Sequence, residues 1–583
     1  MGRDVIRLTQ GRININICEK MARGPVRASG TPGGVGSGIT RTRGQYGIQS
    51  HVQRYALTVD KFLDHAAKWW GSREIVTARP GRPEQRICYS ASRERSNRLS
   101  GALRALGLSF GDRVATLAWN TQHHFEMYYA VMSAGYVCHT LNPRFTVEQL
   151  AAITNEAEDR VVAVASDLLP LIAQLVPLCP GIEHLIVMDD EPQNTELAEG
   201  FGNPRIWWFE SLLQEHGAPV EWGDFDEESA AGLCYTSGTT GSPKGVLYTH
   251  RSNYLHTLRA LQADAMAITG SDALLIAVPM FHANGWGLPF AIPAVGAKMV
   301  LPGRNTDGAS LARLMREEKV TMAAGVQTVW LGVVDHLDAV GGALPDLQRV
   351  LIGGSNCPDA LIRRMEERLG AQVQTSWGMT ELSPLGTIAA PDASPSAARA
   401  SGRPVMGLDL KLTDAEGKIL DQQRGAVGHL WVKGPSVVER YYKADVTALD
   451  DEGYFNTGDL ATLDEAGNLT ISGRSKDLIK SGGEWINPVE VEDIVGRHPS
   501  VRQVAVIGRP DEKWGERPVL IVEPRAGQSL DADALLESLQ GKVAKWWIPD
   551  RVAQVRSMPL ASTGKIDKNR LRADFAQLNP GDE

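Results

Sequence analysis

The sequence predicts an α/β protein, with a large domain of layered α/β subdomains and one β-rich subdomain, followed by a small α+β domain. Three observations lead to this fold class. From about residue 55, apolar runs typical of buried strands alternate with segments of helical periodicity, which indicates parallel sheets covered by helices. Between residues 402 and 473, short β segments separated by glycines dominate. After residue 476, a smaller unit again combines strands with a helix.

The spacing of apolar residues gives the individual elements. Residues 359–369 form a helix with one apolar stripe, made by Leu361, Ile362, Met365 and Leu369. A second helix is expected at residues 531–545. Strands are expected at residues 113–119, 160–165, 184–188, 273–278 and 349–352, then at 411–413, 428–433 and 469–471, and finally at 504–507 and 518–522.

Length and composition exclude several classes of protein. A chain of 583 residues is too long for one ordinary domain. Its content of 43% hydrophobic and 22% charged residues is that of a globular protein, which excludes disorder, collagen and coiled coil for most of the chain. The net charge of −9 argues against a nucleic-acid partner, because such proteins neutralise phosphates. No apolar run approaches 18 residues, so no transmembrane segment is expected.

Six cysteines are scattered along the chain without any Cys-x-x-Cys spacing: Cys18, Cys88, Cys138, Cys179, Cys234 and Cys357. This pattern is typical of reduced thiols in a cytoplasmic protein, and it speaks against a disulfide framework or a zinc cluster. We therefore expect a cytoplasmic location.

The first 48 residues differ from the rest, with eight Arg or Lys and two Asp or Glu. Such a basic, Gly- and Ser-rich segment is expected to be disordered. It could be a transit peptide. The alternatives are an upstream start codon, with Met21 as the other start, or a plain disordered tail, and we favour these two.

The strongest local motif is residues 235–245 (YTSGTTGSPKG), which follow a strand-like apolar run. Its glycines let backbone N–H groups approach an anion, its hydroxyls add donors, and Lys244 adds a positive charge, as a triphosphate requires. It is not a Walker A loop, because Lys244 follows Pro243 and precedes Gly245. An eleven-residue run so rich in glycine and hydroxyl residues favours an anion-binding loop over an ordinary solvated turn.

This motif resembles the phosphate-binding signature of the adenylate-forming superfamily, which includes acyl-CoA synthetases, firefly luciferase and peptide-synthetase adenylation domains. Further motifs of that family follow in order: residues 375–381 (TSWGMTE), 457–459 (TGD), 473–484 (GRSKDLIKSGGE) and 562–567 (STGKID). The likeness spans about residues 55 to 575. It implies the adenylate-forming fold, and it is greatest to bacterial medium- and long-chain fatty-acid–CoA ligases and to methylthio-propionate–CoA ligases.

The resemblance implies an ATP site. In it Glu381, beside Thr380, holds Mg²⁺ together with Thr240, and the Asp459 carboxylate accepts the ribose hydroxyls. Without the motifs, Glu381 would be an ordinary helix N-terminus, Asp459 an Asx-turn residue and Trp377 a core side chain. The ATP-binding residues implied are Thr236, Ser237, Gly238, Thr239, Thr240, Gly241 and Lys244, then Gly353, Gly354 and Ser355 near the adenine, then Thr375, Ser376, Trp377, Gly378 and Met379, and finally Asp459 and Arg474.

The resemblance also implies two uses of the small domain. Lys565 first reaches the acid carboxylate and the α-phosphate of ATP; on its own, a lysine so late in the chain would be a solvated surface group. Rotation about a hinge at Lys476 then presents a CoA-side loop made by Lys480, Ser481, Gly482, Gly483 and Glu484. The predicted domains are therefore a leader (residues 1–48), a large ATP- and acid-binding domain (49–475) and a small C-terminal domain (476–583).

The acid pocket is expected near residues 281–287 (FHANGWG). By resemblance His282 orients the carboxylate or gates thiol entry; the alternative is that it is only a structural hydrogen-bonding residue. Trp286 and Gly287 would shape the pocket, opposite Val326, Gln327 and Thr328, and the bulk of Trp286 hints at a shorter or medium acid. Because residues 283–289 carry no charge, they lack an acidic anchor for an amino acid, which favours a plain carboxylic acid.

Residues 107–111 (GLSFG) match the Gly-x-Ser-x-Gly pattern of serine hydrolases, but a helical pattern precedes them and a strand follows, the reverse of a nucleophile elbow. A hydrolase and a non-catalytic adenylate-binding protein are thus the weaker alternatives. The prediction is an AMP-forming acid–CoA ligase that uses ATP, Mg²⁺ and CoA on a medium- or long-chain fatty acid, or alternatively on methylthio-propionate or another short or aryl acid. A homodimer and a peripheral membrane contact are further expectations.

Overall fold

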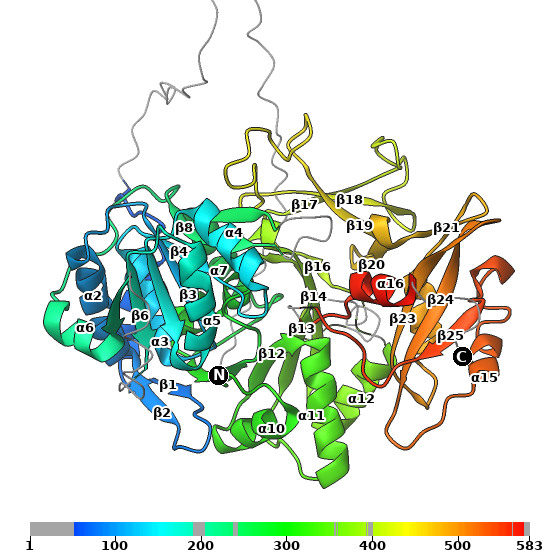
Figure 1. Cartoon of the computed structure of the whole chain (residues 1–583), viewed down its shortest axis with the longest axis horizontal. Helices are drawn as coiled ribbons and strands as arrows, with labels where there is room; N and C mark the ends of the chain where they lie inside the picture. The colour runs from blue at the N-terminus through cyan, green and yellow to red at the C-terminus, as the bar shows by residue number, and fades with distance from the viewer. Residues whose placement is uncertain are drawn as a thin grey trace, which may run out of the picture. The chain divides into compact units, whose positions relative to one another are not determined.

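Four β-sheets and the helices that cover them make up the part of the chain that the structure describes (Figure 1). The computed structural model describes residues 52–189, 204–236, 243–354, 357, 359–391, 393, 400–561 and 564–576. Residues 56–583 form one unit, and residues 1–55 form another, of which only 52–55 are described. The predicted leader, residues 1–48, therefore lies outside the described residues.

The first sheet has seven strands in the order β7-β6-β5-β3-β4-β8-β9, all parallel except β9. Its strands are β3 (Arg113–Leu117), β4 (Val137–Thr140), β5 (Val161–Ala165), β6 (His184–Met188), β7 (Arg205–Trp208), β8 (Ala230–Tyr235) and β9 (Gly245–Thr249). Its helices are α2 (Tyr89–Ala105), α3 (Gln122–Ser133), α4 (Val147–Ala157), α5 (Leu169–Leu175), α6 (Phe209–His216) and α7 (His250–Ala260).

The second sheet has nine strands in the order β16-β15-β14-β13-β12-β10-β11-β1-β2, parallel from β14 to β1. Its strands are β1 (Glu74–Thr77), β2 (Gln85–Cys88), β10 (Ala273–Ile276), β11 (Lys298–Leu301), β12 (Met322–Val326), β13 (Arg349–Gly353), β14 (Gln372–Gly378), β15 (Leu385–Ile388) and β16 (Arg403–Pro404). Its helices are α1 (Asp60–Trp69), α8 (Ala283–Trp286), α9 (Leu288–Val295), α10 (Gly308–Glu317), α11 (Gln327–Val340) and α12 (Asp359–Leu369).

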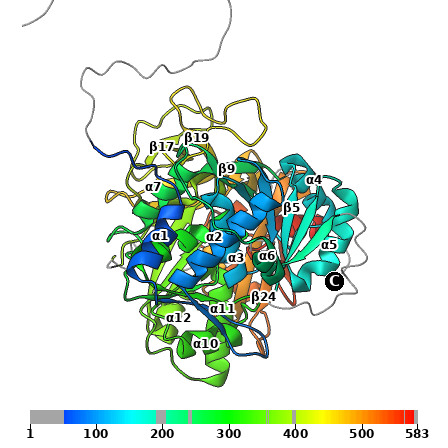
Figure 2. The ribbon, with the colours of Figure 1, turned by 90° about the vertical axis from the view of Figure 1, so that its left-hand side faces the viewer.

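The largest hydrophobic core lies between these two sheets. It joins Val114 of β3 and Leu274 of β10 to aromatic side chains such as Phe125 and Tyr128 of α3. Helices α2 and α3 lie side by side there (Figure 2). The outer face of each sheet has its own core, under α4 and α5 for the first sheet and under α10, α11 and α12 for the second. This is the layered α/β arrangement that the alternating pattern predicts.

The last two sheets are smaller. The antiparallel third sheet comprises β17 (Asp409–Thr413), β18 (Val427–Lys433), β19 (Phe455–Leu463) and β20 (Leu469–Arg474). The fourth comprises β21 (Ile479–Ser481), β22 (Glu484–Ile486), β23 (Val501–Asp511), β24 (Gly515–Pro524) and β25 (Arg551–Gln554), with α14 (Pro488–Val495), α15 (Ala532–Glu537) and α16 (Lys568–Ala576) (Figure 1, orange and red). Lys476 lies between these two sheets, in a short 3-10 turn (Ser475–Asp477); its role as a hinge stays a prediction.

Most expected elements are present, including the helix Asp359–Leu369 and every expected strand. The helix expected at residues 531–545 is wrong, because α15 ends at Glu537. Beyond it, Leu539 and Gln540 donate their N–H groups to carbonyls three residues back, and Gly541 takes a positive φ of 71° that a right-handed helix does not allow.

The Gly-x-Ser-x-Gly segment forms a turn between a helix and a strand, as expected. Helix α2 ends at Ala105, Gly107 and Gly111 have φ of 85° and 84°, and β3 follows at Arg113. Ser109 is exposed on this turn. The segment therefore lacks the strand–turn–helix geometry of a nucleophile elbow.

Two further observations concern the described residues. Their five cysteines are free thiols, and all but Cys88 are buried. No described helix is long and apolar enough to cross a membrane.

Candidate active site

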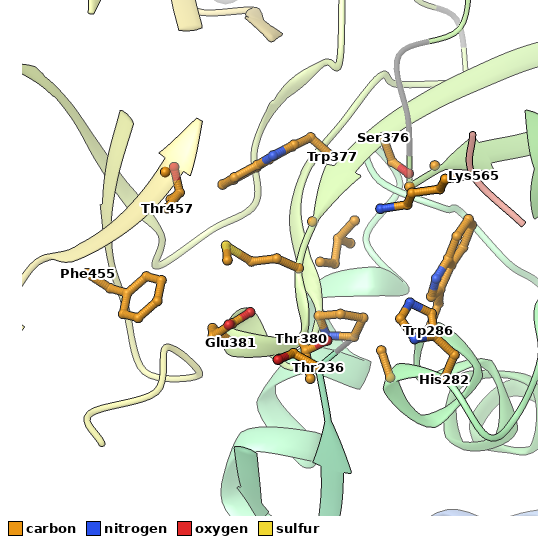
Figure 3. A pocket seen from close by; sticks show the side chains of 18 of the residues that line it. Thr236, His282, Trp286, Ser376, Trp377, Thr380, Glu381, Phe455, Thr457 and Lys565 are labelled. Carbon is orange, nitrogen blue, oxygen red and sulfur yellow. The ribbon is translucent and has the colours of Figure 1, made fainter. Parts of the chain in front are cut away.

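One cavity of about 440 Å³ collects most of the described residues that were predicted for catalysis and ATP binding (Figure 3). It opens at the carboxyl ends of β8, β13 and β14, which is where open α/β sheets bind ligands. The third sheet and the turn that bears Lys565 complete its wall. The lining residues are Thr236, Lys244, Met266, His282, Ala283, Trp286, Gly353, Gly354, Ser376, Trp377, Gly378, Met379, Thr380, Glu381, Pro384, Leu385, Tyr441, Phe455, Asn456, Thr457, Gly458, Arg474 and Lys565.

Not every predicted residue lines this cavity. Predicted residues that lie outside the described part of the chain are Ser237, Gly238, Thr239, Thr240, Gly241 and Ser355. Described but absent from the lining are Gly287, Val326, Gln327, Thr328, Thr375, Asp459, Lys476, Lys480, Ser481, Gly482, Gly483 and Glu484. The last five form the turn between β21 and β22, which is exposed apart from Ser481.

Glu381 lies in a one-turn 3-10 helix (Thr380–Leu382) that follows β14, and only 7% of it is exposed. Tyr441 Oη donates a hydrogen bond to its Oε1 across 2.9 Å. Burial raises the pKa of the Glu381 carboxyl, and the Tyr441 hydrogen bond opposes that rise. The Tyr248 hydroxyl holds the same turn by donating to the Thr380 carbonyl at 2.8 Å.

Asp459 lies on β19 directly opposite Arg474 of β20. Trp377 Nε1 donates to its Oδ2 at 2.9 Å, and Arg474 Nε lies 3.3 Å from its Oδ1. The carboxylate is thus engaged on both oxygens and almost fully buried, which raises its pKa. Its neighbours Thr457 and Gly458 line the cavity. Contact of Asp459 with ribose stays a prediction.

Lys565 enters the cavity from a tight turn. Ala561 N–H donates to the Lys565 carbonyl at 2.7 Å, and Gly564 takes a positive φ of 82° that favours glycine. The Lys565 amine points into the cavity near Ser376 (Figure 3). Burial, together with the charge of Arg474, lowers the Lys565 pKa to about 8, against the opposing charges of Asp459 and Glu381.

His282 and Trp286 line the cavity on the same side as Lys565 (Figure 3). Burial lowers the His282 pKa to about 4, helped by the charges of Lys565 and Arg144, so its ring is neutral at pH 7. The Trp286 ring lies against the Gly353 backbone, where an added Cβ would come within 3.0 Å of Trp286 Cη2. Glycine is therefore needed at position 353.

The segment between them is a left-handed turn. Five successive residues have positive φ, from 46° at Ala283 to 72° at Gly287. Of the three that are not glycine, Asn284 tolerates this region, whereas Ala283 and Trp286 cost about 1–2 kcal/mol each. The His256 ring closes the space behind Gly287, 2.5 Å from where a Cβ would lie. The strained turn thus sets the direction of both His282 and Trp286.

Several lining residues were not predicted: Met266, Pro384, Leu385, Tyr441, Phe455 and Asn456. They belong to no glycine-rich or charged motif. Thr457 and Gly458 belong to the TGD motif and were therefore detectable. Tyr441 in particular is 60 residues from Glu381 in sequence, so only the tertiary fold brings the two together.

Comparison with known proteins gives the class. The model of AMP-binding enzymes matches residues 63–442, and that of the AMP-binding enzyme C-terminal domain matches residues 490–565. The chain belongs to this family, the adenylate-forming superfamily. Among solved structures, ATP-bound MatB from Rhodopseudomonas palustris superimposes with a TM-score of 0.75 at 25% identity, covering 89% of this chain and 99% of that one. The anthranilate CoA ligase AuaEII superimposes with a TM-score of 0.79 at 24% identity, covering 89% and 97%.

Curated relatives narrow the class to an AMP-forming acyl-CoA ligase, which uses ATP and CoA. The chain is 40% identical to a medium-chain-fatty-acid–CoA ligase of Ectopseudomonas oleovorans, over 90% of this chain and 97% of that protein. It is also 40% identical to a 3-methylmercaptopropionyl-CoA ligase of Ruegeria lacuscaerulensis (90% and 98%) and to a long-chain-fatty-acid–CoA ligase of Thermus thermophilus (89% and 96%).

Proposed function

We propose that this ligase activates a medium-chain fatty acid. A carboxylate oxygen attacks the α-phosphorus of ATP and expels pyrophosphate, which leaves acyl-AMP. The CoA sulfur then attacks the acyl carbon, and AMP departs with the electrons of the broken C–O bond. The observation that supports this proposal is the meeting of Lys565, Glu381 and Arg474, from three separate motifs, at one cavity.

Lys565 would serve the first half-reaction. Its ammonium reaches the cavity from the opposite side to Glu381 (Figure 3). A pKa of about 8 leaves it mostly protonated at neutral pH. It can therefore stabilise negative charge as pyrophosphate leaves.

The nucleotide would occupy the remaining wall. Thr236 and Lys244 flank the phosphate loop, Trp377 and the Gly353–Gly354 backbone border the adenine, and Asp459 and Arg474 lie on the ribose side. Of these, Asp459 alone is absent from the lining. To accept a ribose hydroxyl, the Asp459 carboxylate would have to give up its hydrogen bond from Trp377 or accept two hydrogen bonds on one oxygen.

Glu381 fits a Mg²⁺ site. Glu381 borders the cavity, and the hydrogen bond from Tyr441 engages its Oε1. Mg²⁺ is commonly held by one or two carboxylates plus substrate phosphates, so one such side chain, with Thr240, is an adequate donor set. The bound ion would neutralise charge on the triphosphate. Within the described residues, no cluster of three or more His, Cys, Asp or Glu forms a protein-only metal site.

The second half-reaction would follow rotation about Lys476. In this structure the Lys565 turn borders the cavity, and the exposed turn of Lys480–Glu484 does not. A rotation that exchanged the positions of these two turns would move Lys565 out of the cavity and bring the CoA-side turn to the acyl-AMP. One site would then serve two chemically different steps.

The acid end of the cavity favours an uncharged, apolar tail of limited length. Trp286 gives this end an aromatic wall, and its indole lies against the Gly353 backbone. The relative named as a medium-chain ligase agrees with this choice. The second candidate is 3-methylmercaptopropionate, the acid in the name of an equally similar relative, which would need still less room. A long-chain acid would need the Trp286 ring to move.

The buried free thiols support a cytoplasmic location, where reducing conditions prevail. A homodimer and a peripheral membrane contact stay predictions.

The test is acid-dependent AMP release with ATP, Mg²⁺ and CoA, across propionate, methylthio-propionate, octanoate, palmitate and benzoate. We expect AMP and acyl-CoA in equal amounts, with octanoate giving the highest kcat/KM. A maximum at methylthio-propionate would favour the second candidate. AMP without any thioester would contradict the proposed transfer to CoA.

A further inference from the structure

Tyr441 contacts two residues of the proposed ATP site that come from different motifs. Its Oη donates to Glu381 Oε1 at 2.9 Å, and the Lys244 ammonium lies 4.8 Å from the centre of its ring. Tyr441 itself lines the cavity. Glu381 is the predicted metal-binding carboxylate, and Lys244 ends the phosphate loop.

The backbone around Tyr441 ties the same two segments together. Val438 N–H donates to the Glu381 carbonyl, and Tyr442 N–H donates to the Gly245 carbonyl, each at 2.8 Å. The Tyr441 ring also meets Phe455 edge-on, with ring centroids 6.4 Å apart. The segment thus makes two contacts with Glu381, from Tyr441 and Val438, and two with the end of the phosphate loop, from Tyr441 and Tyr442. These contacts fix its position relative to both.

We propose that Tyr441 is a positioning residue, which holds the Glu381 carboxylate and the Lys244 ammonium in one arrangement around the triphosphate of ATP. This inference rests on the proposed function of Glu381. The hydroxyl gives a buried carboxylate its hydrogen bond, and such charge-assisted bonds are strong. The ring gives the ammonium a cation–π contact, which limits the directions that a flexible lysine can take.

Two substitutions separate the two contacts. Tyr441→Phe removes only the hydroxyl, while Tyr441→Leu removes the hydroxyl and the aromatic face. Tyr442→Phe is the matched control, because the neighbouring hydroxyl contacts neither Glu381 nor Lys244 in any hydrogen bond of the structure. Calorimetry gives dissociation constants for ATP with Mg²⁺, ATP with EDTA, and AMP, so the measurement does not depend on turnover.

For Tyr441→Phe we expect binding of ATP with Mg²⁺ to weaken about tenfold, since a hydrogen bond to a charged group is lost. Binding of ATP with EDTA and of AMP should stay within twofold. Tyr441→Leu should also weaken binding of ATP with EDTA several-fold, because Lys244 loses its cation–π contact with the Tyr441 ring. Binding of AMP should stay unchanged. Tyr442→Phe should resemble the unmodified protein.

Glu381→Gln separates this inference from the proposed function. If Glu381→Gln leaves binding of ATP with Mg²⁺ unchanged, the metal role of Glu381 is wrong. If Glu381→Gln weakens that binding and Tyr441→Phe does not, the role of Tyr441 is wrong. In a Glu381→Gln background, Tyr441→Phe should add less than twofold. The inference would also be overturned if Tyr441→Phe weakened AMP binding as much as binding of ATP with Mg²⁺. The same holds if Tyr442→Phe weakened binding of ATP with Mg²⁺ as much as Tyr441→Phe does.

Discussion

Thr328 Oγ1 donates a hydrogen bond to the Gly564 carbonyl across 2.9 Å. Thr328 lies in the first turn of α11, which packs on the second sheet, and Gly564 directly precedes Lys565. A Cβ added to Gly564 would lie 3.2 Å from Val326 Cγ2, so the turn sits close against the end of β12. The predicted acid-pocket residues Val326 and Thr328 therefore hold the lysine turn in place.

Thr328→Val should slow adenylation and spare thioester formation. Valine keeps the shape but removes the hydroxyl, so the turn loses one hydrogen bond, a loss of about 1 kcal/mol or roughly fivefold in rate. Acid-dependent exchange of pyrophosphate into ATP measures the first half-reaction, and acyl-CoA formed from supplied acyl-AMP measures the second. Thr328→Ser should restore the exchange rate. Equal slowing of both half-reactions would show that the bond does not act through Lys565.

Adenylation should decline in alkaline solution. Burial and Arg474 lower the Lys565 pKa to about 8, so the charged ammonium predominates below that pH and is lost above it. Because kcat/KM for ATP reports ionisations of the free enzyme, its profile should fall with a midpoint near pH 8. Bound ATP should move the corresponding midpoint in kcat to higher pH.

Lys565→Arg is the control for that profile. A guanidinium stays charged throughout this range, so whatever activity remains should lack the alkaline fall. A fall at the same pH in Lys565→Arg would assign the ionisation to another group.

An ion pair between Arg502 Nε and Asp335 Oδ2, 3.1 Å long, joins β23 to α11. Arg502 also pairs with Glu523 of β24. Both Arg502 and Asp335 are about one-third exposed, so the pair is worth at most about 1 kcal/mol. Asp335→Asn should slow pyrophosphate exchange two- to threefold and flatten its dependence on salt between 50 and 500 mM.

Asp338→Asn is the matched control for this pair. Asp338 lies on the same helix and binds Arg364 and Arg368, both of α12, so its loss breaks no contact to the fourth sheet. Equal effects of the two substitutions would mean that the Arg502 pair does not favour the arrangement with Lys565 in the cavity.

Trp286→Ala should shift the preferred acid to longer chains. The indole lies against Gly353. In the proposed function it closes the acid end of the cavity, so its removal should open space for several methylene groups. Each methylene accommodated is worth about 1 kcal/mol or more. The ratio of kcat/KM for palmitate to that for octanoate should therefore rise at least tenfold. An unchanged ratio would show that Trp286 is not the wall that limits chain length.

The sequence predicted those parts of the site that lie in local motifs. Glycines at strand ends, as at Gly353 and Gly354, and hydroxyls after β14 are recognisable because a close backbone approach to a ligand requires them. The turn that presents Lys565 is recognisable for the same reason, since Gly564 takes a positive φ.

Local patterns of this kind cannot predict contacts between segments that are distant in the sequence. Trp377 and Asp459 are 82 residues apart, and their hydrogen bond depends on how β19 lies against β14. Tyr441 carries no local signal at all. The left-handed conformation of Ala283 and Trp286 contradicts the ordinary preference of these residues, so tertiary packing must impose it.

The most direct test of this account measures the two half-reactions of Lys565→Ala separately. With acid, ATP and Mg²⁺, we expect the exchange of pyrophosphate into ATP to fall by at least a hundredfold, because the only lysine that lines the described cavity besides Lys244 is lost. With supplied acyl-AMP and CoA, acyl-CoA should form at a rate within threefold of the unmodified protein. Equal loss of both half-reactions, or full retention of the first, would contradict the account.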